Sequence, residues 1–202
     1  QGWGCRKRAF RFKNKLLSLD STTISLCLSL FPWASFRRTK GGVKLHVLLD
    51  HDDYLPSYLH ISEARRHDRW GAQVVRLAPG SIVACDRGYN DYDLFGQWTE
   101  QGVYFVTRLK SNALYDVVEA RPVPKNSQIL SDERIQLRGF RAPDSCPYTL
   151  RRIVVWLPEK RDILELLTNH LGFGATTIAM IYKDRWEIEV FFKAIKQNLK
   201  IR

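Results

Sequence analysis

The chain has 202 residues, of which 45% are hydrophobic, and its 32 Lys and Arg outnumber 21 Asp and Glu to give a formal charge of +11. This length suits one domain, or one domain with an insertion, and the hydrophobic fraction excludes a disordered protein. No apolar run reaches the roughly 20 residues that cross a bilayer, so we expect no membrane span. The positive charge favours nucleic acid as a partner, although basicity alone leaves other classes of protein open.

The cysteines and the two ends of the chain bear on its compartment. Cys5, Cys27, Cys85 and Cys146 are too far apart to form a C-x-x-C pair, so we expect reduced thiols. The basic start lacks the apolar stretch and cleavage site of a signal peptide, which predicts a cytoplasmic protein. The missing initiator Met, and a helical pattern that still runs at residue 202, lead us to expect truncation at both ends.

The first part of the chain has the pattern of an antiparallel meander. A strand over 16–30 carries Asp20, and the segment 43–50 alternates apolar and polar residues as a second strand. A polar turn then leads to a third strand over 54–61. A basic loop lies between the first two strands and contains Arg37, Arg38 and Lys40.

The middle of the chain alternates helices with strands. We expect a helix at 62–71, a strand at 81–85, a helix at 92–101 and a strand at 103–109. The strand before Asp86 is short and entirely apolar, which indicates a central, buried strand with Asp86 at its C-terminal tip. Asp91 can cap the helix that follows. The strand, helix, strand order predicts parallel pairing.

The remainder divides into a strand-rich segment and a terminal helix. Residues 111–172 contain short strands, such as 134–140 and 148–157, between several prolines. We therefore expect a core formed by 1–110 and 173–202, with 111–172 as a β-rich insertion. The segment 176–200 has no Gly or Pro and has apolar residues at helical spacing, which predicts one long amphipathic helix.

Four polar residues of that helix share one narrow face. Tyr182, Arg185, Glu189 and Lys196 stand at offsets 0, 3, 7 and 14, so one carboxylate lies between two cations. For an arbitrary helix, a solvated charged stripe with ordinary ion pairs is the better interpretation. Arg185 can also pair with Glu189 one turn away.

The spacing Y-x2-R-x3-E-x6-K, written YKDRWEIEVFFKAIK, resembles the signature of bacterial insertion-sequence transposases of the DDE class. Leu19-Asp20-Ser21-Thr22 and Asp86-Arg87-Gly88-Tyr89 resemble the segments with that family's first two catalytic aspartates. The resemblance implies an α/β, ribonuclease-H-like mixed sheet flanked by helices, with a β-rich insertion before the last helix. It assigns catalysis and the binding of two Mg²⁺ ions to Asp20, Asp86 and Glu189.

Two metal ions suit this chemistry because in-line displacement at a phosphodiester requires charge neutralisation at the attacking and the leaving oxygen. Mg²⁺ prefers hard oxygen ligands, which a few carboxylates provide, and we expect Mn²⁺ to substitute for it. Taken singly, each acid also has an ordinary interpretation: Asp20 as a local partner of Ser21, Asp86 as a turn residue, and Glu189 as helix surface.

The resemblance further implies DNA contacts by Tyr182, Arg185 and Lys196. Arg and Lys suit phosphate because one offers a bidentate fork and the other a point charge. The loop residues Arg37, Arg38 and Lys40 are further candidates to follow a DNA backbone, although a solvated loop is at least as good an interpretation. For Trp156 and Trp186, stacking on an unpaired base competes with core packing, which we expect for both.

We therefore expect a DNA transposase catalytic domain that performs metal-dependent phosphodiester hydrolysis and strand transfer at insertion-sequence ends. Its partners would be double-stranded DNA at transposon ends and target, and a second copy of the full-length protein in a homodimer. It would act in the bacterial cytoplasm, associated with the nucleoid. The alternatives are a metal-dependent nuclease of the same fold and a catalytically inactive, DNA-binding transposase remnant.

Overall fold

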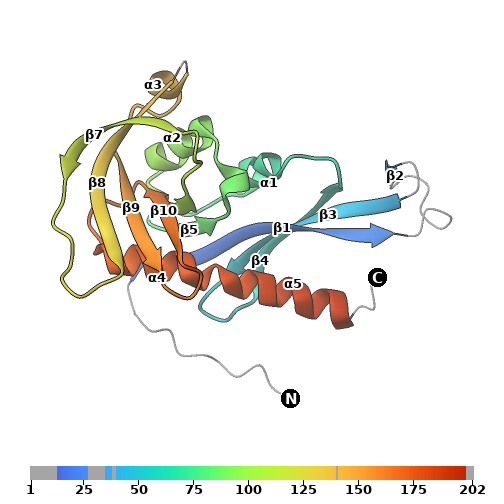
Figure 1. The fold of residues 1–202 in the computed structure, drawn as a ribbon. Coiled ribbons are helices and arrows are strands. Elements are labelled where there is room, and N and C mark those ends of the chain that lie inside the picture. Colours follow the sequence, from blue (N-terminus) through green and yellow to red (C-terminus); the bar gives the residue numbers. More distant parts are fainter. Residues whose placement is uncertain (1–12, 27–34, 38–39, 140, 199–202) are drawn as a thin grey trace.

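The computed structural model describes residues 13–26, 35–37, 40–139 and 141–198, which form a ten-stranded mixed sheet with helices on both faces (Figure 1). The strands are β1 (Leu16–Leu26), β2 (Ser35–Arg37), β3 (Lys40–Asp50), β4 (Pro56–Glu63), β5 (Ile82–Cys85), β6 (Tyr104–Arg108), β7 (Leu114–Ala120), β8 (Ile129–Arg138), β9 (Leu150–Leu157) and β10 (Asp162–Thr168). The helices are α1 (Asp68–Val74), α2 (Tyr92–Glu100), α3 (Ala142–Ser145), α4 (Ala175–Asp184) and α5 (Trp186–Asn198), with a short 3₁₀ turn, η2 (Arg87–Tyr89). The strand order is β2-β3-β1-β5-β6-β10-β9-β8-β7, and β4 also pairs with β3.

The meander of β1, β3 and β4 is confirmed. β1 pairs antiparallel with β3, and β3 pairs antiparallel with β4. The strand expected over 16–30 ends at Leu26, and residues 27–30 lie outside the described part. The helix expected at 62–71 is wrong at its start, because Ser62 pairs with Lys44 and continues β4. Helix α1 instead begins at Asp68, after the side chain of His67 accepts a hydrogen bond from the Arg69 backbone N–H.

The expected parallel pairing is confirmed for three neighbouring strands. β5 lies between β1 and β6 and is parallel to both, with all four of its residues buried. Between β5 and β6, helix α2 is capped by Asp91, whose Oδ1 accepts a hydrogen bond from the Leu94 N–H at 3.1 Å. Gly102 has a φ of +69°, which a residue without a Cβ adopts readily, so the chain turns there into β6.

The alternation of side chains along β1 separates two apolar clusters on opposite faces of the sheet. Leu17 and Leu19 pack with residues of α1 and α2, whereas Leu16 packs with Ile178 and Ile181 of α4. Asp20 is four residues from Leu16 and therefore lies on the α4 side. Helix α5 covers the next part of that same face, against β3.

The segment 111–172 extends the main sheet. Strand β10 pairs antiparallel with β6, and β9, β8 and β7 follow outward. A buried ion pair between Arg151 and Asp132, with Nη2 and Oδ2 2.6 Å apart, joins β9 to β8. Arg151 also donates to the carbonyl of Phe173, just before α4. Arg151 therefore connects strands β8 and β9 to the start of α4, the helix that precedes α5.

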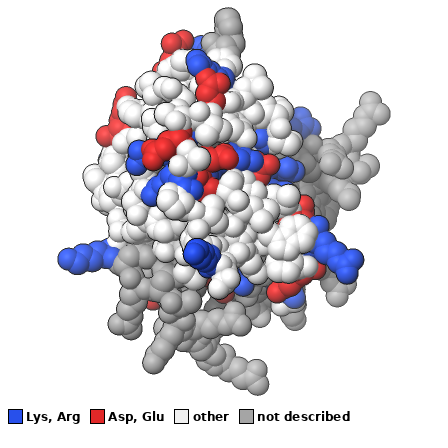
Figure 2. Space-filling view, turned by 60° about the vertical axis from the view of Figure 1, so that its left-hand side comes forward, with Lys and Arg blue, Asp and Glu red and all other residues white. Residues whose placement is uncertain are grey.

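Positive and negative side chains are mixed on the face of the molecule that Figure 2 shows, in which the left-hand side of Figure 1 is turned forward. Lys and Arg side chains lie among Asp and Glu side chains, with a broad uncharged area below them (Figure 2). Among the described residues, ion pairs join Arg134 to Glu119, and Arg152 to Glu133 and Glu165, across strands β7 to β10. The net positive charge of the chain does not therefore produce a cationic patch on this visible face.

The terminal helix is interrupted, so the expectation of one helix over 176–200 is wrong. Helix α4 ends at Asp184 and α5 begins at Trp186, with Arg185 between them. The Arg185 N–H bonds to the carbonyl of Tyr182, and the Ile188 N–H bonds to the carbonyl of Arg185. Both bonds span three residues, the tighter 3₁₀ spacing, and this local tightening interrupts the α-helical pattern.

Candidate active site

Asp20 and Asp86 extend from adjacent parallel strands. In the β1–β5 pairing Leu19 stands opposite Cys85, and each aspartate is the next residue of its chain. Asp86 lies at the C-terminal end of β5, immediately before the 3₁₀ turn η2. The two aspartates are therefore neighbours at one place on the sheet.

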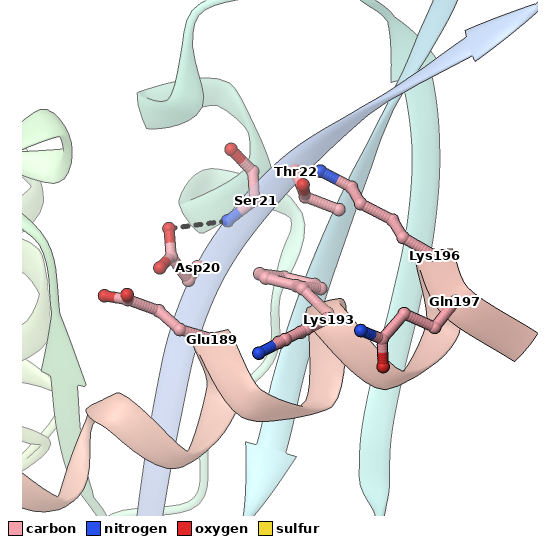
Figure 3. Close-up of a pocket in the computed structure, with 8 residues that line it drawn as sticks. Asp20, Ser21, Thr22, Glu189, Lys193, Lys196 and Gln197 are labelled. Atoms are coloured by element: carbon pink, nitrogen blue, oxygen red, sulfur yellow. Dashed lines mark hydrogen bonds between the residues drawn. The ribbon is translucent and has the colours of Figure 1, made fainter. Parts of the chain in front are cut away.

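Glu189 reaches this place from α5, through Arg185. The Arg185 guanidinium donates through Nη1 to Asp20 Oδ2 at 3.0 Å and through Nη2 to Glu189 Oε1 at 2.8 Å. In Figure 3 the carboxylates of Asp20 and Glu189 lie close together where α5 passes β1. The pairing of Arg185 with Glu189, considered from the sequence, is thus confirmed, and Asp20 is a second partner.

The protonation of Asp20 reflects its surroundings. Burial raises the pKa of this carboxyl to about 6, while the Ser21 N–H and the Arg185 cation oppose the rise. The nearby negative charges of Asp86 and Glu189 also contribute to this raised pKa. A buried carboxylate with two acidic neighbours and one cation favours additional positive charge beside it.

A hollow of about 470 Å³ opens between β1 and α5 next to these acids. Its walls are formed by Asp20, Ser21, Thr22, Glu189, Phe192, Lys193, Lys196 and Gln197. Lys196 extends toward Thr22 in Figure 3, at the end of the hollow away from Glu189. Lys193 was missed by the sequence reasoning, although its position four residues after Glu189 places it on the same helix face.

The residue types suit a divalent cation, because carboxylates supply the hard oxygen atoms that Mg²⁺ prefers. A cation, the Arg185 guanidinium, already bridges two of them. In the part of the chain that the structure describes, no three His, Cys, Asp or Glu side chains stand close enough together to hold a metal ion. Asp20 and Glu189 are brought together, and Asp86 approaches from the adjacent strand.

Comparison with known proteins identifies the family. Residues 11–202 match the Transposase DDE domain. The chain belongs to the DDE transposase family. A transposase of Sinorhizobium fredii is 35% identical over 191 residues, covering 91% of this chain and 52% of the relative. A transposase for an insertion-sequence element of Geobacillus stearothermophilus is 29% identical over 196 residues, covering 96% of this chain and 51% of the relative.

The DDE transposase domain described here spans about half the length of these relatives. Among solved structures, the piggyBac transposase in a synaptic complex with hairpin DNA resembles it with a TM-score of 0.51 and 11% identity, over 89% of this chain and 40% of that one. This likeness shows a shared fold. No helix in the described part of the transposase domain is long and apolar enough to span a membrane.

The other signature residues of the transposase domain are placed as follows. Tyr182 is half-buried against the apolar cluster under α4, and burial raises its pKa. The Arg185 guanidinium lies 5.5 Å from the centre of the Tyr182 ring. Arg37 and Lys40 are backbone partners where β2 meets β3, and Arg38 lies outside the described residues.

The two tryptophans considered for base stacking are exposed, so the expectation that they pack in the core is wrong. Trp156 near the end of β9 is 37% exposed, and Trp186 at the start of α5 is 59% exposed. Cys85 and Cys146 are free thiols, as expected, and the structure buries both, whereas Cys5 and Cys27 lie outside the described residues.

Asp68 is a neighbour of the site that sequence reasoning missed. Its Oδ1 accepts hydrogen bonds from Ser21 Oγ at 2.6 Å and Lys44 Nζ at 3.0 Å. Burial raises the pKa of Asp68, but these hydrogen bonds and the Lys44 charge outweigh burial and lower it. The Asp68 carboxylate therefore fixes the side chain of Ser21, the residue that follows Asp20. No local motif indicates this contact, because it joins α1 to β1 across 47 residues.

Proposed function

We propose that this domain is the catalytic unit of an insertion-sequence transposase, which hydrolyses phosphodiester bonds at the ends of the element and joins them to a target. The observation that carries the proposal is the convergence of Asp20 and Glu189 on Arg185, with Asp86 on the adjacent strand. Membership of the DDE transposase family supports the same assignment.

Asp20, Asp86 and Glu189 would hold two Mg²⁺ ions, for which Mn²⁺ would substitute. When bound, such ions neutralise charge on the attacking and leaving oxygens of an in-line displacement. The protein contributes rigid placement, because Asp20 lies on β1, Asp86 directly follows the paired strand β5, and Glu189 lies on a helix packed against the sheet. Arg185 keeps the Asp20 and Glu189 side chains oriented toward each other.

Double-stranded DNA is the proposed partner, at transposon ends and at the target. Lys193 and Lys196 line the hollow beside the acids, where a phosphate backbone would pass. We assign further DNA contacts to the remaining candidates: Tyr182, Arg185, Arg37, Arg38 and Lys40. The full-length protein would act as a homodimer at the bacterial nucleoid.

We further propose that the sheet is of the ribonuclease-H-like type. The meander β1, β3, β4 followed by the parallel strands β5 and β6 supports this type, as do the helices on both faces. In this scheme 1–110 and 173–202 form the catalytic core, and 111–172 are inserted before α4.

The test is DNA cleavage and joining by the full-length protein with Mg²⁺, with Mn²⁺ or with chelator. We expect Glu189→Gln to abolish nicking while DNA affinity stays within about twofold, because Gln keeps the shape but loses the charge that holds a metal ion. Glu187→Gln is the matched control on the same helix, outside the hollow, and should cleave normally. Lys196→Ala should show the opposite balance, with weaker DNA binding and retained metal binding.

The outcomes separate the alternatives. Cleavage at the wild-type rate by Glu189→Gln would make Glu189 a surface residue and end the three-acid assignment. Nicking without any joined product would indicate a nuclease of the same fold. An absence of nicking with every metal, together with intact DNA binding, would indicate an inactive remnant.

A further inference from the structure

A second hollow, of about 370 Å³, lies at the C-terminal ends of β5 and β6. Its lining residues are His67, Arg87, Gly88, Lys110, Ser111 and Asn112. Arg87 and Gly88 belong to the turn after β5, and the last three residues follow β6. Because β1, β5 and β6 are parallel, the hollow opens at the same edge of the sheet where Asp86 stands.

The two walls of this hollow are joined by Asn90. Its side-chain amide donates to the Arg108 carbonyl at 2.8 Å, and its Oδ1 accepts from Thr107 Oγ1 at 2.9 Å. Lys110 Nζ donates to the Asn90 carbonyl at 3.2 Å. These bonds fix the turn after β5 against the end of β6, so Arg87 and Lys110 are held on facing walls.

The lining favours an anion. It contains the cations Arg87 and Lys110, the ring of His67, and the polar side chains of Ser111 and Asn112, while the nearby carboxylates of Asp68 and Asp86 adjoin only the Gly88 part of the wall. Among the described residues, the Arg87 guanidinium has no hydrogen-bond or ion-pair partner. Asp68, the nearest acid in sequence to His67, is already bonded to Ser21 and Lys44.

The hollow is also next to the proposed catalytic centre. A Cβ placed on Gly88 would lie 3.8 Å from Asp86 Oδ2 and 3.4 Å from Asp68 Oδ2. A group bound against Gly88 is thus within a few ångströms of the second catalytic acid. The first hollow, on the β1 side, and this one, on the β6 side, lie on either side of Asp86 along the sheet.

We propose that this second hollow binds a backbone phosphate of the DNA strand that passes the acids. This inference rests on the proposed function. Arg87 and Lys110 are exposed, and exposed ion pairs each contribute little, so a free phosphate ion would be held weakly. A DNA backbone engages both hollows at once, and the effective concentration of the second phosphate is then high.

The experiment compares Arg87→Gln/Lys110→Gln with Lys13→Gln/Arg76→Gln in the full-length protein. The control pair removes the same charge from exposed residues before β1 and β5, at the opposite edge of the sheet. With a 40-base-pair duplex ending in the element's terminal repeat, we expect the first variant to bind about three- to tenfold more weakly and its log–log salt slope to fall by about one unit. The control should keep the wild-type slope.

Two arms identify which DNA supplies the phosphate. A loss in binding the terminal-repeat duplex assigns it to the transposon end. A loss confined to the joining of pre-cut ends into a supercoiled plasmid assigns it to the target. Unchanged binding and joining, or an equal loss in the control, would overturn the proposal while wild-type cleavage still upheld the proposed function. If the wild type failed to cleave, the proposed function would fail, whereas the salt slopes would still report on the hollow.

Discussion

Arg185 occupies an unusual place among the charged residues, because a single guanidinium serves two carboxylates that come from β1 and α5. Only 12% of its side chain is exposed, so its charge is poorly screened by water. Burial of Asp20 would be unfavourable without this cation, as its raised pKa indicates. Arg185 therefore contributes to stability when no divalent cation is bound.

The first prediction follows from that role. Arg185→Gln should lower the free energy of unfolding by roughly 2–4 kcal/mol in chelator, because it leaves the Asp20 carboxylate, whose side chain is only 18% exposed, without its cation. Added Mg²⁺ or Mn²⁺ should then stabilise this variant more than the wild type, since the metal ions supply the missing charge. Thermal unfolding of both proteins with and without metal measures the difference.

Arg69→Gln is the matched control for Arg185. Arg69 also forms an ion pair, with Nη1 2.6 Å from Asp91 Oδ2, but its side chain is 56% exposed. We expect a loss of at most about 1 kcal/mol, because Arg69 is solvated and Asp91, although only 7% exposed, keeps the Leu94 N–H as a hydrogen-bond partner. Equal losses in the two variants would show that Arg185 is an ordinary surface partner.

At this scale, local spacing predicted part of the site. The positions of Arg185 and Glu189 one turn apart predicted their ion pair, and it is present. The bond from Arg185 to Asp20 joins residues 165 positions apart, and no local pattern contains it. Glu189 was singled out by the spacing of polar residues along its helix, and Asp20 and Asp86 by their family-like segments.

Among the elements, the break between α4 and α5 shows where local pattern reading ends. The segment lacks Gly and Pro, so intrinsic propensity favours an unbroken helix. The contacts of Arg185 with β1 and of α4 with the sheet are tertiary, and they set the direction of each helix separately. Sequence patterns therefore predicted the existence of the helix but not its interruption.

Helix α2 supplies the second prediction, at Gly96. Gly in a helix costs about 1 kcal/mol relative to Ala, so propensity alone predicts that Gly96→Ala stabilises the protein. A Cβ at this position would lie 2.1 Å from the backbone carbonyl oxygen of Ser145, which cannot rotate away. We expect destabilisation by about 1–3 kcal/mol in urea unfolding, as for an overpacked core.

Gly174→Ala is the control for this substitution. Gly174 stands before α4, and a Cβ there would meet no atom closer than 3.7 Å. Its unfolding free energy should change by less than about 0.5 kcal/mol. A more stable Gly96→Ala variant would show that α2 and α3 separate easily.

At the scale of the whole molecule, the ten strands of the described part form one continuous sheet. Its first strands, β1 to β6, were more predictable from the sequence than β7 to β10. The meander and the parallel strands follow from alternation and from strand, helix, strand order. The joining of β10 to β6 is long-range, so the sequence indicated strands in 111–172 without showing that they extend the same sheet. Cross-strand pairing depends on partners distant in sequence, which a local pattern does not specify.

The pH dependence of global stability gives the third prediction. His46 is fully buried in β3, and burial lowers its pKa from 6.5 to about 4, with Lys44 and His60 adding to the decrease and Asp68 opposing it. Between these two pH values the unfolded chain binds a proton that the folded chain does not. Stability is therefore complete above pH 6.5 and falls toward pH 4, by up to about 3 kcal/mol from this group.

Urea unfolding of wild type and His46→Gln in chelator between pH 4.5 and pH 7.5 measures this contribution. The difference in unfolding free energy between the two proteins should shrink as the pH falls, because only the wild type loses the stability that neutral His46 contributes. A constant difference across the pH range would show that His46 titrates normally.

The separation of Asp20 and Arg185 by 165 positions also means that the ribosome makes the acidic residues of the site at very different times. At roughly 5–20 residues per second, the ribosome needs about ten to thirty seconds to add the 165 residues between them. Throughout that interval the nascent chain carries Asp20, and later Asp86, without the helix that bears Glu189. Under the proposed three-acid assignment, a chain abandoned by the ribosome before α5 would lack Glu189 and would therefore not cut DNA.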